Sequence, residues 1–186
     1  LGEEQSGHIN EVGYELYQQM LEETIARLRS GELSDLSDGQ WAPQINLGVP
    51  VLIPETYVTD LDVRLGLYRR LSTLEKKVEF EGFAAELIDR FGELPKEVNT
   101  LLAVVRIKAL CKRAHIARLD AGPKGATVQF YQDKYPNPKG LVEFLHAQSG
   151  ARIRDNKVVL PSDWTSEKDR LRGAFAIARA LAEKVA

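Results

Sequence analysis

The segment from Glu79 to Pro95, EFEGFAAELIDRFGELP, constrains the fold of this chain more than any other stretch. Its apolar residues recur at the spacing of a single helix face, which we expect to be buried: Phe80, Phe83, Ala84, Leu87, Ile88 and Phe91. Gly92 predicts the end of this helix, and Pro95 predicts the start of another one directly after it. The fold must therefore accommodate two successive helices that a short turn connects.

Two carboxylates, Glu86 and Asp89, stand opposite this apolar stripe. They lie three residues apart on the expected helix, so their like charges repel by roughly 0.2 to 0.5 kcal/mol. Asp89 also falls in the last turn, where the negative end of the helix dipole disfavours an anion. An ion pair from Glu86 to Arg90, four residues on, accounts for Glu86 but leaves Asp89 unexplained. The residues alone are equally compatible with a solvated face and with an interaction site.

The rest of the chain alternates between helical and strand-like patterns. Apolar spacing and capping residues predict further helices over about 8–30, 60–75, 95–114, 138–148 and 163–184. Asp60 or Asp62 is the expected cap of the second, and the helix over 95–114 is so apolar that we expect it to be central. Alternation between turn residues predicts a short strand over 45–49 and hairpins over about 116–131 and 151–160. The first hairpin is expected to have a four-residue connection, residues 122–125, and the second a two-residue turn, Asp155–Asn156. We therefore expect an α+β fold: a mostly helical single domain with a small, largely antiparallel sheet built from hairpins, plus an N-terminal helical arm.

A segment without periodicity, GELSDLSDGQWAP from Gly31 to Pro43, separates the first helix from the rest. It holds no basic residue and many residues typical of loops, which indicates a solvated acidic linker. We therefore divide the chain into a connecting segment, residues 1–43, and a C-terminal domain, residues 44–186. The chain does not begin with Met, and we expect it to be a fragment of a longer protein.

Composition excludes several classes of protein. The net charge of -2 and the isoelectric point near 6.0 argue against a general nucleic-acid or membrane-surface binder. The single cysteine, Cys111, excludes an internal disulfide framework and fits a cytoplasmic protein. No apolar run reaches the length of about 18 residues that a membrane span requires.

No residue pattern predicts a catalytic centre, a metal site or a cofactor. Cys111 and His115 lie four residues apart on one expected helix, as a thiolate and imidazole pair would, but a buried structural cysteine is the commoner explanation. The glycine-rich run GPKGAT, residues 122–127, joins two expected strands, whereas a phosphate-binding loop must open a helix. We therefore expect a chain that is not an enzyme.

The densest basic cluster comprises Arg106, Lys108, Lys112, Arg113 and Arg118. Such a cluster can contact phosphates, and an accessory nucleic-acid-binding domain is the alternative function that we retain. Cations near the end of a helix also complement the helix dipole, and the cluster holds no aromatic residue on which a base could stack. The cluster is therefore a weaker candidate than the carboxylate pair.

Three segments carry a resemblance to a known family: GEEQSGHINEVGYELYQQMLEE, VPVLIPETYVTDLDVRLGLYRRL and ELIDRFGELP. Together they resemble the C-terminal region of bacterial transcription-repair coupling factors (Mfd). The resemblance implies a regulatory, non-catalytic TRCF domain that follows a RecG-like DNA translocase. In that family the domain packs on the UvrB-homology module of the same protein and masks the surface that recruits UvrA. The full-length protein binds RNA polymerase and double-stranded DNA, and engagement of stalled polymerase is expected to release the contact.

The resemblance also implies roles for individual residues. Glu86 and Asp89 match the carboxylates of the intramolecular contact, where the partner module presents arginines, and Arg90 is the expected neighbour that orients Glu86. Gln5 matches the glutamine of the motif that couples ATP hydrolysis to DNA movement. Because the motor domains are absent from this chain, we expect no coupling role for Gln5 here. The resemblance implies no cofactor and no membrane partner.

Overall fold

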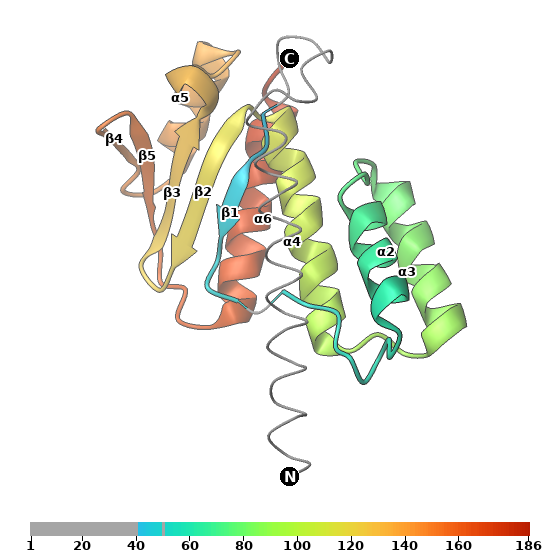
Figure 1. Ribbon diagram of the computed structural model, residues 1–186. Helices are drawn as coiled ribbons and strands as arrows, with labels where there is room; N and C mark the ends of the chain where they lie inside the picture. Colours follow the sequence, from blue (N-terminus) through green and yellow to red (C-terminus); the bar gives the residue numbers. More distant parts are fainter. Residues whose placement is uncertain (1–40, 50) are drawn as a thin grey trace.

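The computed structural model describes residues 41–49 and 51–186 (Figure 1). Gln5, the predicted helix over 8–30 and most of the predicted linker lie outside the described residues. The described helices are α2 (Leu61–Leu71), α3 (Lys77–Phe91), α4 (Lys96–Arg113), α5 (Pro138–Ala147) and α6 (Glu167–Glu183), with a 3-10 turn, η1 (Tyr131–Asp133). The described strands are β1 (Gln44–Asn46), β2 (Ile116–Gly122), β3 (Gly125–Phe130), β4 (Arg152–Arg154) and β5 (Lys157–Pro161). This arrangement confirms the predicted α+β fold.

The strands form one sheet in the order β1-β2-β3-β5-β4. Every neighbouring pair is antiparallel except β1 and β2, which run parallel, so the sheet is largely antiparallel as predicted. β1 occupies an edge of the sheet and is shorter than the predicted strand over 45–49.

Both predicted hairpins are present. β2 and β3 are joined by Pro123 and Lys124 alone, because Gly122 and Gly125 already pair across the ladder. The connection is therefore two residues long instead of the predicted four. Gly125 has φ +117°, and a Cβ there would lie 2.1 Å from the carbonyl oxygen of Leu160, so only glycine fits.

The β4–β5 turn follows the sequence prediction directly. Asp155 and Asn156 adopt φ of 50° and 60°, the left-handed conformation that a two-residue hairpin turn requires. Both residue types tolerate that conformation because their short polar side chains can hydrogen-bond locally.

α4 and α6 cover one face of the sheet, where they enclose the larger hydrophobic cluster (Figure 1). Ile107 and Cys111 of α4 are completely buried there, together with Leu119 of β2, Val128 of β3 and Leu181 of α6. Burial of such side chains supplies the main stabilising term, about 1.5 to 3 kcal/mol for each large one.

α2 and α3 pack on the other side of α4, away from the sheet, and enclose a second cluster (Figure 1). Its most deeply buried members are Ile53, Val58, Leu67, Leu71, Phe83, Leu87, Val98 and Leu101. α4 therefore contributes its first turns to one cluster and its later turns to the other.

Local hydrogen bonds set the helix ends. The Asp60 carboxylate accepts a hydrogen bond from the Val63 N–H at 2.9 Å, which confirms Asp60 as the cap of α2. α2 ends at Leu71, short of the predicted residue 75, where the Ser72 and Thr73 hydroxyls donate back to the carbonyls of the last turn.

α6 begins later than its predicted start near residue 163. The N–H groups of Ser162 and Trp164 donate to the carbonyls of Lys124 and Pro123 in the β2–β3 turn, which holds these residues out of the helix. Ser166 then caps α6 through a hydrogen bond from the Asp169 N–H at 3.1 Å.

Candidate functional site

α3 is an outer helix, and its exposed face carries the residues on which the sequence prediction centred (Figure 1). Phe80, Phe83 and Leu87 are buried as predicted. The prediction that Ile88 belongs to the core is wrong, because half of its surface is exposed. Each helical residue advances by about 100°, so Ile88 lies past the edge of the stripe that α2 and α4 cover. Sequence spacing cannot distinguish a stripe this wide from a narrower one.

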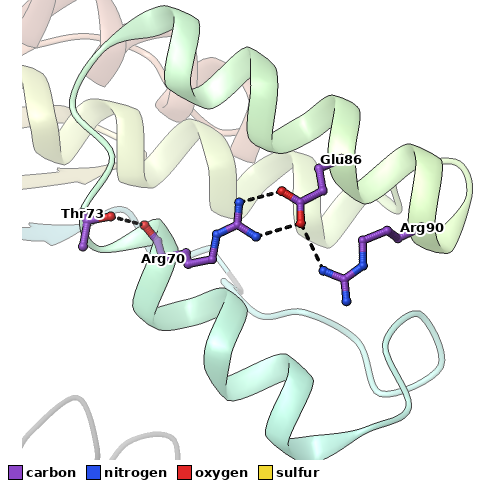
Figure 2. A network of polar contacts seen from close by, with 4 residues as sticks. All are labelled: Arg70, Thr73, Glu86 and Arg90. Atoms are coloured by element: carbon purple, nitrogen blue, oxygen red, sulfur yellow. Dashed lines mark hydrogen bonds and ion pairs between the residues drawn. The ribbon is translucent and has the colours of Figure 1, made fainter.

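The Glu86 carboxylate is held between two arginines, and Figure 2 shows the arrangement. Arg90 Nη1 donates to Glu86 Oε1 at 3.1 Å, which confirms the predicted pair four residues apart. Arg70, from the last turn of α2, donates from Nη1 to Oε1 at 2.8 Å and from Nη2 to Oε2 at 2.6 Å. This two-pronged contact is the strongest geometry available to an arginine and a carboxylate.

Sequence reasoning missed Arg70. It lies 16 residues before Glu86 and on a different helix, so no spacing rule links them. Only the packing of α2 against α3 brings the two side chains together. A basic residue in the last turn of the preceding helix was the one available signal, and helix-dipole arguments already explain such a residue.

The two arginines change the electrostatics of Glu86. Hydrogen bonds from Arg70, and to a smaller extent from Arg90, lower the pKa of Glu86 to about 2. Glu86 in turn raises the pKa of Arg70. Half of the Arg70 side chain is exposed, so solvent screens the pair and its contribution to stability is modest.

Both guanidinium groups also lie over aromatic rings. Arg70 Cζ is 5.1 Å from the centroid of the Phe83 ring, and Arg90 Cζ is 4.8 Å from that of Phe91. Each arginine therefore spans a carboxylate and an aromatic face, a combination that fixes the guanidinium plane.

Asp89 differs from Glu86 in its surroundings. It is exposed, and in the part of the chain that the structure describes no hydrogen bond or ion pair engages its carboxylate. Ile88 exposes apolar surface beside it. Of the two carboxylates that the sequence singled out, Glu86 is therefore bonded to two arginines and Asp89 is exposed to solvent.

Most of the basic cluster makes contacts inside the domain. Arg106 lies over the Phe175 ring at 4.9 Å, and Arg118 Nε contacts Asp120 Oδ2 at 2.7 Å. Burial lowers the pKa of Lys108. Lys112 lies over the Trp41 ring at 4.2 Å and donates to the Trp41 carbonyl. These contacts account for Arg106, Lys112 and Arg118 without a nucleic acid.

Trp41 is the second residue that sequence reasoning missed. Its ring stacks on that of Tyr131 with a centroid distance of 4.6 Å and an interplanar angle of 8°. Lys112 also contacts the Trp41 ring, so aromatic residues do lie beside the basic cluster, but they pack against one another. Trp41 belongs to a segment that was interpreted as linker because it lacks periodicity.

The expected placement of Cys111 and His115 on one helix is wrong. α4 ends at Arg113, and His115 follows it with φ 56°, outside the helix and exposed. Cys111 is completely buried, and burial raises the pKa of its thiol to about 12. A thiol in this state is a core residue and not a nucleophile.

No three His, Cys, Asp or Glu side chains within 41–49 and 51–186 gather as metal ligands would. None of the helices in these ranges is both long enough and apolar enough to cross a lipid bilayer.

Comparison with known proteins connects this domain to a family. Residues 47–141 match the model of the TRCF domain. The transcription-repair-coupling factor of Rickettsia prowazekii (strain Madrid E) is 49% identical over 156 residues, which cover 84% of this chain and 14% of that protein. That of Escherichia coli (strain K12) is 32% identical over 188 residues, which cover 98% of this chain and 16% of that protein. The chain thus spans only a small part of the length of these relatives.

A solved structure shows the same fold. The crystal structure of the C-terminal domain of transcription-repair coupling factor aligns with a TM-score of 0.68 at 21% sequence identity. The alignment covers 79% of this chain and 96% of that chain. The chain therefore belongs to the TRCF domain family of bacterial transcription-repair coupling factors.

Proposed function

We propose that this chain is a non-catalytic regulatory domain that packs on the UvrB-homology module of the same protein. In this proposal the contact masks the surface that recruits UvrA until the motor of the full-length protein engages stalled RNA polymerase. The observation that carries the proposal is the exposed end of α3, where Asp89 and Ile88 stand beside Glu86. Membership of the TRCF family supports it.

The end of α3 suits a basic partner surface. Asp89 sits near the negative end of the helix dipole, an unfavourable place for an anion in the isolated domain. A cation from a partner would offset that penalty with a charge-assisted hydrogen bond. Ile88 adds apolar surface next to the charge, and burial of an aliphatic side chain at the centre of a contact strengthens it.

Such a contact must be modest in strength. A ligand can shift an equilibrium only by the difference between its affinities for the two states. A domain that covers a recruitment surface until the motor engages must therefore bind weakly enough for a few kcal/mol to release it. An exposed contact of a few residues, rather than a large apolar interface, fits that requirement.

Calorimetric titration of the UvrB-homology module with this chain tests the proposal. Wild-type chain should bind, and Glu86→Lys with Asp89→Lys should abolish binding while the chain stays folded, because neither residue is in the core. Glu143→Lys with Glu183→Lys is the matched control: it makes the same charge change on the exposed surfaces of α5 and α6. Equal affinities for wild type and the α3 double variant would refute the proposal.

A further inference from the structure

We propose that Arg70 competes with the partner module for Glu86 and thereby limits the strength of the α3 contact. This inference rests on the proposed function. It assigns a role to a residue of α2, which Figure 2 shows bonded to the Glu86 carboxylate. In it, Arg70 acts as an intramolecular substitute for an arginine of the partner.

The geometry leaves little of Glu86 available. A carboxylate offers about four acceptor positions on its two oxygens. Arg70 uses one position on each oxygen, at 2.8 and 2.6 Å, and Arg90 uses a third at 3.1 Å. A partner arginine that approached in the same two-pronged way would need both oxygens at once. It must therefore displace Arg70 to bind Glu86 fully.

The charges act in the same direction. Arg70 and Arg90 carry two positive charges against the one negative charge of Glu86, so the trio has a net charge of +1. An incoming cation is repelled by this trio and attracted by Asp89. Asp89 is thus the first carboxylate that a basic partner reaches, and Glu86 becomes available only when Arg70 moves.

Arg70 is able to move. Half of its side chain is exposed, and its guanidinium lies over the Phe83 ring at 5.1 Å, a contact that does not require Glu86. It also occupies the last turn of α2, where the helix dipole favours a cation. Release of Glu86 therefore leaves Arg70 in a favourable environment.

The test compares Arg70→Gln with Arg69→Gln in the same titration against the UvrB-homology module. Both changes remove one positive charge from the last turn of α2, but only Arg70 is bonded to Glu86. An exposed ion pair of this kind corresponds to a gain in affinity of about two- to fivefold. We expect that gain for Arg70→Gln and no gain for Arg69→Gln. Unchanged or weaker binding by Arg70→Gln overturns the inference, as does an equal gain from Arg69→Gln.

A second comparison uses Glu86→Gln as the background. If Arg70 acts by occupying the carboxylate, Arg70→Gln should add no more affinity than Arg69→Gln does once Glu86 is neutral; a larger gain from Arg70→Gln in that background contradicts competition. Thermal unfolding of each variant confirms that the chain remains folded. The two proposals fail in different ways. If the wild-type chain does not bind the module, the proposed function fails. If it binds but Arg70→Gln does not increase the affinity, only the role of Arg70 fails.

Discussion

Glu86 and Asp89 show how packing gives two similar side chains different surroundings. In sequence they form one like-charged pair, and in the structure they have different surroundings. The i,i+4 pair from Glu86 to Arg90 was predictable because it depends on helix geometry alone. The contact with Arg70 was not, because it depends on how two helices pack.

The contacts of Glu86 with Arg70 and Arg90 make the stability of the folded chain depend on pH in a defined direction. Because the folded pKa of Glu86, about 2, lies below its ordinary value of 4.5, its contribution is fully present above pH 4.5 and disappears as the pH falls through 2. Wild type should exceed Glu86→Gln in unfolding free energy by about 0.5 to 1 kcal/mol near pH 6, after discounting for solvent screening. Urea titrations at pH 6 and near pH 2.5 should show this difference shrinking.

Asp89→Asn is the control variant for that experiment. It removes one charge from the same helix without breaking a hydrogen bond within the described residues. Near pH 6 it should leave stability unchanged or raise it by up to about 0.5 kcal/mol, because it relieves the helix dipole. A larger loss for Asp89→Asn than for Glu86→Gln would show that the roles of the two residues are reversed.

Capping and turn residues predicted the ends of helices and strands better than apolar spacing did. The Asp60 cap, the Gly92 stop and the Asp155–Asn156 turn each depend on a few adjacent residues, and each is present. The end of α2 and the start of α6 were misplaced. Side-chain hydroxyls set the end of α2, and carbonyls of the β2–β3 turn set the start of α6. Neither kind of hydrogen bond leaves a periodic pattern in the sequence.

Two helical glycines give opposite predictions for the same substitution. A Cβ at Gly173 of α6 would lie 2.1 Å from a ring carbon of Trp164, so Gly173→Ala should destabilise the chain by about 1 to 3 kcal/mol. Gly82 of α3 has open space around it, and Gly82→Ala should stabilise the chain by roughly 0.5 to 1 kcal/mol. Midpoints of thermal unfolding measure both changes, and a shift in the same direction for the two variants would contradict the packing of Trp164 on α6.

α4 joins the two hydrophobic clusters into one structure. Leu101 of α4 belongs to the cluster with α2 and α3, whereas Ile107 belongs to the cluster with the sheet. The apolar character of α4 made its central position predictable. The division into two clusters was not, since residues on all sides of a buried helix are apolar.

This shared helix predicts that the clusters unfold together. Leu101→Ala should cost about 2 to 5 kcal/mol and lower the denaturant midpoint. Both tryptophans of the chain, Trp41 and Trp164, lie on the sheet side, so their fluorescence reports the cluster that does not contain Leu101. Fluorescence and far-ultraviolet circular dichroism should give the same lowered midpoint. An unshifted fluorescence transition would mean that the clusters unfold separately.

The anchoring of Trp41 and β1 determines how the domain responds to force. Trp41 is fixed by Tyr131 and Lys112, and β1 then pairs with β2 on the side of α4 that faces away from α3 (Figure 1). A force applied to the chain before Trp41 acts first on the stack of Trp41 with Tyr131 and on the pairing of β1 with β2. Under the proposed function, a force transmitted to the domain through Trp41 would therefore move the domain as a unit and leave the carboxylates of α3 in place.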